Sequence, residues 1–217
     1  MPDATSIGGT VRDRAANELR DRILTGRLPP GTRVDLDAIT AEFGTSRTPV
    51  REALLELSYE GLVAVAPRSG ITVVGITPDD AVDNFAVLAA LAGKAAEWAA
   101  TRMTPDELAE LHDLAAAIDT ADDVVAANRR FHRAVNLASR SPRLLTFLRQ
   151  AARMVPTNYF ELFPEQERTS REDHAALLGA LERRDAPAAR AIAEAHILDA
   201  GEALGEWLRS RAHGRAG

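Results

Sequence analysis

A chain of 217 residues is long enough for two domains, and its net charge of −6 argues against indiscriminate binding to nucleic acid. It contains no cysteine, which excludes disulfides and thiolate metal sites and fits a reducing cytoplasm. We find neither an apolar signal region at the N-terminus nor an apolar run of membrane-spanning length. A cytoplasmic protein with no membrane partner is therefore expected.

The first third of the chain predicts two helices, a turn, a third helix and a hairpin. An amphipathic pattern covers residues 11–25, and a shorter one covers 36–43. Gly44 then turns the chain into a helix that Ser46 can cap. Two short β-branched runs, at 62–66 and 71–74, flank a four-residue loop and indicate a hairpin. This order is typical of a winged helix-turn-helix, which binds a DNA duplex.

The third helix carries the residues best suited to reading DNA. Arg47 and Arg51 are four positions apart and therefore share one helical face. Val50, Leu54 and Leu57 repeat at helical spacing on a neighbouring face, which can pack against the rest of the domain. An arginine fork suits two-point contact with guanine or phosphate. The alternative is an ordinary surface helix with solvated arginines.

The segment 26–74 resembles the N-terminal domain of the GntR family of bacterial transcription regulators. The resemblance rests on the turn Leu28-Pro29-Pro30-Gly31, on the run from Ser46 to Leu54, and on Glu60-Gly61-Leu62-Val63. Some members place an arginine early in the second helix, where Asp35 or Asp37 stands here, so fewer phosphate contacts are expected from that helix. The residues expected to contact DNA, with the last at the wing tip, are Ser46, Arg47, Thr48, Arg51, Arg68 and Gly70.

From Thr77 onward the hydrophobic period is helical throughout, which predicts a bundle of antiparallel helices joined by short loops. The expected fold is mainly α, with a winged helix-turn-helix over residues 1–76 and an all-α six-helix bundle over 77–217. The third bundle helix should bury Val125, Phe131, Val135 and Leu137. The chain shows no phosphate-binding loop, nucleophile elbow or dinucleotide fingerprint, so an enzyme is not expected. The six helices are expected at 81–103, 104–118, 122–139, 141–163, 164–184 and 187–211.

Three histidines occupy separate bundle helices. His132, His174 and His196 each have apolar neighbours, and Asn128 precedes His132 by four residues on the same face. Converging imidazoles would suit zinc or another first-row transition metal. Spacing alone favours the other interpretation, in which the three are separate core residues with their own hydrogen bonds. His112 and His213 are expected at the surface.

The second half resembles the FCD effector domain that follows one GntR-type winged helix, the FadR type, in its shorter, vanillate-repressor-like subgroup. This resemblance implies that His132, His174 and His196 bind a divalent transition metal, zinc or nickel, and that the effector cavity surrounds them. Asn128 stands where the family usually has Asp, and it would be a weak ligand because an amide brings no charge.

The combined interpretation is a ligand-responsive transcription regulator that binds an inverted-repeat operator in double-stranded DNA as a homodimer. Repression relieved by a small-molecule effector is the commoner mode in the family. Leu88 and Ala92 stand where the family commonly shows Arg and Glu, which argues against a small carboxylate as effector. One alternative is a regulator that has lost sensing. A more distant one is a metal-dependent hydrolase with Glu172 or Asp173 as base.

Overall fold

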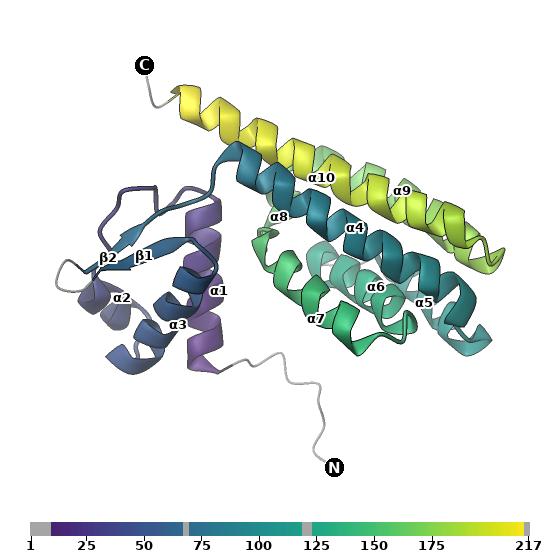
Figure 1. The fold of residues 1–217 in the computed structure, drawn as a ribbon, viewed down its shortest axis with the longest axis horizontal. Coiled ribbons are helices and arrows are strands. Elements are labelled where there is room, and N and C mark those ends of the chain that lie inside the picture. Colours follow the sequence, from purple (N-terminus) through teal and green to yellow (C-terminus); the bar gives the residue numbers. More distant parts are fainter. Residues whose placement is uncertain (1–9, 67–69, 119–122, 215–217) are drawn as a thin grey trace, which may run out of the picture. The chain divides into compact units, whose positions relative to one another are not determined.

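The structure is a computed structural model that describes residues 10–66, 70–118 and 123–214. It divides into two compact units, Met1–Ile76 and Thr77–Gly217. The first contains three helices and a hairpin in its described part, and the second is helical throughout its described part (Figure 1). Among the described ranges, no helix is both long and apolar enough to cross a membrane.

The first unit confirms the winged helix-turn-helix order. Its helices are α1 (Val11–Leu24), α2 (Leu36–Glu42) and α3 (Arg47–Tyr59), and its hairpin consists of β1 (Val63–Ala66) and β2 (Gly70–Val73). The strands pair antiparallel, and the first residue of β1 lies opposite the last of β2. The predicted wing loop lies largely outside the described residues, which resume at β2.

The core of this unit forms between α1 and α3. Leu19 of α1 and the predicted apolar face of α3, Val50, Leu54 and Leu57, have no exposed surface. Burying each such side chain stabilises the fold by about 1.5–3 kcal/mol. α1 begins at a capping box in which Thr10 and the residue at its N3 position exchange hydrogen bonds, which satisfies two backbone donors.

A buried ion pair ties α1 to the end of α3. Nε and Nη2 of Arg20 lie 2.7 and 2.8 Å from the two carboxylate oxygens of Glu60, the residue that follows α3. The side chains are only 4% and 13% exposed. Because both nitrogens and both oxygens are used, the pair fixes the angle as well as the distance between the two segments.

The chain between α1 and α2 lies along the hairpin. The N–H groups of Gly31 and Val34 donate to the carbonyls of Val73 and Ile71, each over 2.8 Å. Arg33 therefore stands beside β2, next to the wing.

The second unit is an all-helical bundle, as predicted. Thr77 and Asp80 form a capping box at its start, and Pro78 occupies the first turn, where its missing N–H costs little. α4 and α10 lie side by side along most of their length (Figure 1). The helices are α4 (Pro78–Arg102), α5 (Pro105–Ile118), α6 (Val124–Ala138), α7 (Pro142–Ala151), the 3₁₀ turn η1 (Ala152–Met154), α8 (Tyr159–Leu162), α9 (Pro164–Glu182) and α10 (Ala186–Gly214).

Two predictions for the bundle are wrong. The single helix expected over 141–163 ends at Ala151, and only the short η1 and α8 follow before α9. Pro156 explains the break, because a proline disfavours helical backbone in the residue before it, and Val155 is extended (φ −85°, ψ 120°). Leu137, expected in the core, is 43% exposed. The buried stripe of α6 passes through Phe131, Val135 and Ala138 instead.

Glycines allow α4 and α10 to approach closely. A Cβ added to Gly201 of α10 would collide with the side chain of Phe85, and one added to Gly93 of α4 would collide with Glu194. Both glycines are buried. The two backbones are therefore closer here than any larger residue would permit.

Candidate DNA interface and metal centre

The leading end of α3 presents the predicted DNA-binding residues to solvent. Ser46 is the N-cap with extended backbone, and its side chain makes no capping hydrogen bond within the described structure. Arg47, Thr48 and Arg51 are all exposed. Because Val50, Leu54 and Leu57 are buried in the core, these polar side chains lie on the solvent-facing side of α3.

Arg47 contacts the start of α2. Its Nη2 lies 2.6 Å from Oδ1 and 2.7 Å from Oδ2 of Asp37. Asp35, the N-cap of α2, accepts hydrogen bonds from the backbone N–H groups of Asp37 and Ala38, each at 3.0 Å. The two aspartates thus have distinct positions, one closing the helix end and the other paired with an arginine of α3.

The wing contributes Gly70 and a residue that the sequence did not single out. Gly70 is exposed with φ +90°, a conformation that favours glycine, and Arg68 lies outside the described residues. A Cβ on Gly70 would stand 3.3 Å from Nε and Nη2 of Arg33, so the Arg33 guanidinium lies against the wing. Arg33 is exposed whereas Val34 is buried. A polar residue followed by an apolar one after the Pro-Gly turn is the sequence pattern from which an outward-facing Arg33 could have been predicted.

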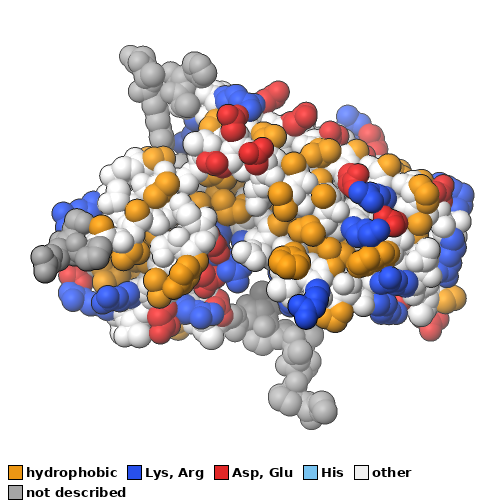
Figure 2. Space-filling model, viewed as in Figure 1, with side chains coloured by type: hydrophobic (Ala, Val, Ile, Leu, Met, Phe, Trp, Pro, Cys, Tyr) orange, Lys and Arg blue, Asp and Glu red, His pale blue; other side chains and the backbone are white. Residues whose placement is uncertain are grey.

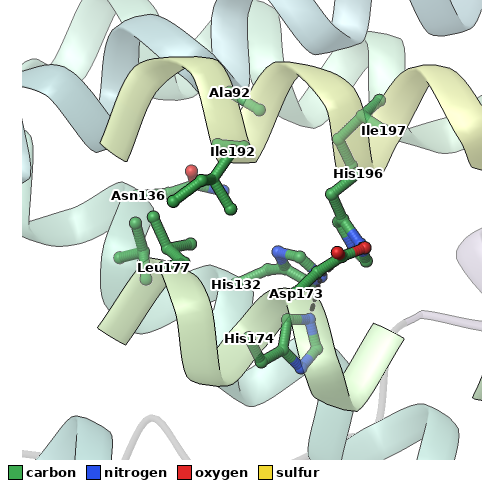
Figure 3. A pocket seen from close by; sticks show the side chains of 11 residues that line it. Ala92, His132, Asn136, Asp173, His174, Leu177, Ile192, His196 and Ile197 are labelled. Atoms are coloured by element: carbon green, nitrogen blue, oxygen red, sulfur yellow. Dashed lines mark hydrogen bonds and ion pairs between the residues drawn. The ribbon is translucent and has the colours of Figure 1, made fainter. Parts of the chain in front are cut away.

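In the bundle, the three predicted histidines converge. Nε2 of His132 lies 3.2 Å from Nε2 of His174 and 3.3 Å from Nε2 of His196. One nitrogen from each of the three residues lies within 4.8 Å of the others. Figure 3 shows them meeting at one end of a cavity, contributed by α6, α9 and α10. The ring of Phe131 stacks on His174 at a centroid distance of 4.3 Å.

The surroundings favour neutral imidazoles. Burial, with the neighbouring His174 and His196, holds the pKa of His132 well below its ordinary value. Burial, followed by the charge of His196, lowers the pKa of His174 to about 3. Only neutral imidazole binds a metal, so these side chains are in the ligand form at neutral pH.

Asp173 orients one of the three rings. Its Oδ2 lies 3.0 Å from Nδ1 of His196, which places the proton on Nδ1 and directs the Nε2 lone pair toward the cluster. From the sequence, the only role expected of Asp173 was that of a catalytic base. Its pairing with His196 depends on how α9 packs on α10, which no local motif encodes.

The donor set fits a divalent transition metal. Three imidazoles bound to one ion at about 2.1 Å would have their nitrogens roughly 3.0–3.4 Å apart, and the two Nε2 separations at His132 fall in this range. Three Nε2 atoms cannot all be satisfied by one another, because each offers either one proton or one lone pair. Two further buried atoms, Nδ1 of His174 and Oδ1 of Asn128, have no hydrogen-bond partner in the described structure. Asn128 does not line the cavity.

The cavity beside the histidines is small and lacks a basic wall. It offers about 20 Å³ to the centres of water-sized molecules, which is room for an ion or one or two waters. Ala92 lies on its wall, whereas Leu88 is buried against Leu144 and Leu148 of α7. No Lys or Arg is among the described lining residues. Those are Ala92, His132, Val135, Asn136, Asp173, His174, Leu177, Ile192, Ala193, His196 and Ile197.

Comparison with protein families assigns both units. The sequence model of the family described as "Bacterial regulatory proteins, gntR family" matches residues 11–73. The one described as "FCD domain" matches residues 83–199, more than half of the chain. The matches cover the winged helix-turn-helix and the helices that carry the histidine cluster.

Comparison with individual proteins supports the same family assignment. The chain is 31% identical to the HTH-type transcriptional regulator McbR of Escherichia coli (strain K12) over 181 residues, which are 78% of this chain and 81% of that protein. It is 34% identical to a probable D-xylose utilization operon transcriptional repressor of Paenarthrobacter nicotinovorans over 66% of this chain and 67% of that protein. The solved structure of E. coli McbR/YncC superposes with a TM-score of 0.69 at 28% identity, covering 92% of this chain and 99% of that one.

Proposed function

Because the chain belongs to the GntR family of bacterial transcription regulators and carries an FCD domain, we propose that it acts in the cytoplasm as a homodimeric repressor that releases an inverted-repeat operator on binding an effector. The protein is a DNA-binding transcription regulator with an effector-binding domain. In the proposal, residues 1–76 bind DNA, and 77–217 bind the effector and form the dimer.

The exposed leading turn of α3 carries the proposal. Arg47, Thr48 and Arg51 face solvent on a helix whose other side is locked in the core, which is how a recognition helix enters a major groove. Gly70 of the wing, Arg33 beside it and Ser46 supply further contacts to the DNA backbone. Since both units are acidic or near neutral overall, affinity depends on these placed arginines.

An exposed apolar surface on the bundle supports dimerisation. Figure 2 shows hydrophobic side chains gathered over the face that carries α4 and α7. Val87 of α4 and Phe147 of α7 are 57% and 58% exposed. A second copy of the chain would cover this face, because a two-fold protein matches a two-fold operator.

Sedimentation of the full chain should give a dimer, and Val87→Glu with Phe147→Glu should give a monomer. A monomeric parent protein would contradict the dimer.

The histidine cluster is the proposed sensing centre. His132, His174 and His196 would hold zinc or nickel, with Asn128 as a weak ligand or none, and the bound ion would supply positive charge to attract an effector atom. The protein's own side chains provide the remaining features of the site. Asp173 holds one ring in place, and the apolar walls exclude water. A ligand changes DNA affinity only if it binds one arrangement of the protein better than another.

Selection from random-sequence duplexes tests the proposed function directly. The full-length protein should enrich a short inverted repeat, and Arg51→Ala should fail to enrich it under the same conditions. Recovery of no preferred sequence would contradict operator recognition. The selected duplex then serves as the operator in all later measurements.

Metal and effector sensing are tested on the same complex. Zinc or nickel, alone or with candidate effectors, should change operator affinity of the parent protein but not that of the variant with all three histidines changed to Ala. No change with any ligand would favour a regulator that has lost sensing. Turnover of a phosphoester or amide after metal loading would instead favour the hydrolase considered from the sequence.

A further inference from the structure

The contact between Asp37 and Arg47 is made through a single nitrogen of the guanidinium. Both oxygens of Asp37 contact Nη2, at 2.6 and 2.7 Å. A guanidinium carries five N–H donors on three nitrogens, and within the described residues neither Nη1 nor Nε of Arg47 makes a hydrogen bond. Both two-donor edges of a guanidinium include Nη2, so while it is paired Arg47 can offer a base single N–H donors from Nη1 or Nε, which suit the neutral acceptors of guanine. The side chains are 68% and 67% exposed, so the pair forms at the surface where DNA would bind.

Asp37 is held in a fixed place by both ends of its helix. Asp35 caps the first turn of α2, as described above. At the other end, Nη1 of Arg22 in α1 lies 3.0 Å from a carboxylate oxygen of Glu42. The backbone that carries Asp37 therefore cannot easily follow Arg47 if the arginine moves away.

A DNA phosphate is negatively charged and the edge of a base is not. The Asp37 carboxylate would therefore repel the phosphate more strongly than the base. A phosphate is an anion that repels the Asp37 carboxylate and competes with it for the guanidinium. The O6 and N7 atoms of guanine accept hydrogen bonds without carrying a full charge. We propose that Asp37 is a specificity-determining residue, which restrains Arg47 for contact with a base and disfavours its use as a phosphate clamp. This inference rests on the proposed DNA-binding function.

Arg51 provides a matched comparison. It lies on the same exposed face of α3, one turn further along, and has no ion pair within the described residues. If Asp37 acts through contact with its partner, changing Asp37 should alter the behaviour of Arg47 and not that of Arg51. If it acts only as a negative charge near DNA, both arginines should respond alike.

The test compares Asp37→Asn with the parent protein on the selected operator and on a scrambled duplex of equal length and composition. The variant should bind the scrambled duplex more tightly, and its preference for the operator should fall about two- to fivefold, the usual range for an exposed ion pair. Freed to contact phosphate, Arg47 should steepen the slope of log K against log salt on the scrambled duplex by about one. Asp37→Glu, which keeps the charge, should restore the parent values.

Double variants decide the mechanism. In an Arg47→Ala background, Asp37→Asn should leave the operator preference unchanged, whereas in an Arg51→Ala background its full effect should persist. An equal gain on both duplexes, or an effect that survives the loss of Arg47, would overturn the proposal while leaving operator binding intact. Failure of the parent protein to prefer any sequence would contradict the proposed function and this inference together.

Discussion

The carboxylate of Asp173 lies 3.0 Å from Nδ1 of His196, so the residue next to one predicted metal ligand orients another on a different helix. Because such a partner fixes the ring and raises its basicity, Asp173→Asn should weaken zinc binding about 10- to 100-fold. A competition titration with a chromophoric chelator measures this. Glu172→Gln is the matched control, since Glu172 is exposed and pairs with Arg168. Equal affinity in the parent protein and Asp173→Asn would contradict the orienting role.

Replacing one histidine of the cluster should abolish stoichiometric metal binding. Protein purified without a His-tag and loaded with zinc should contain metal by mass spectrometry, and His132→Ala should not. His112→Ala should match the parent, because His112 is half exposed and pairs with Glu182 at the surface. A parent protein that retains no metal after loading would leave the histidines as hydrogen-bonding groups of the cavity.

Asn128→Asp should tighten metal binding. The Oδ1 of Asn128 is buried one helical turn before His132 and has no hydrogen-bond partner among the described residues, and a carboxylate at that position would bring negative charge toward a cation. The same chelator competition gives the change in affinity. Weaker binding by Asn128→Asp would show that this position lies outside the reach of the ion.

Arg47→Ala and Arg51→Ala should each weaken operator binding by about 1–3 kcal/mol without unfolding the protein. Gel-shift titration measures the affinity, and circular dichroism checks the fold. Arg133→Ala, at an exposed position of α6, serves as the control. If both α3 variants bind the operator like the parent, the recognition helix has been assigned wrongly.

Arg20→Ala should destabilise the first unit by about 3–5 kcal/mol, because it removes the positive charge that pairs with the largely buried Glu60 carboxylate. Urea unfolding followed by circular dichroism gives the free energy of unfolding. Arg12→Ala, which removes an exposed pair with Asp13, should cause no measurable change. Similar unfolding midpoints for the two variants would show that the Arg20–Glu60 pair contributes no more than a surface contact.

The starts of helices such as α4 and α7 could be predicted from the sequence because a local signal marks them. Thr77 followed by Pro78 marks α4, and Ser141, whose Oγ accepts the N–H of Leu144 at 3.3 Å, marks α7. Pro156 also predicts a break after α7, whereas the apolar period through Leu148 and Met154 predicts an unbroken helix. The two local signals disagree, and the structure follows the proline.

Contacts between elements could not be predicted in the same way. The sequence predicted His132, His174 and His196 on three helices, but only the packing of those helices brings their nitrogens within 4.8 Å. The pairs of Asp37 with Arg47 and of Asp173 with His196 likewise join residues that no spacing rule connects. Propensity and periodicity act within an element, whereas these pairs depend on the angle and separation between elements.

The close approach of α4 and α10 limits how the cavity beside the histidines can vary in size. Gly93, where a side chain would collide with Glu194, adjoins the wall residue Ala92, and Glu194 is two residues from His196. Because a Cβ at Gly93 would meet the Glu194 side chain, the packing of α4 on α10 leaves little room on this side of the cavity. Rotamer changes alone offer a bulkier molecule little additional space on this side. Such a ligand could enter on this side only if α4 and α10 moved apart as it bound.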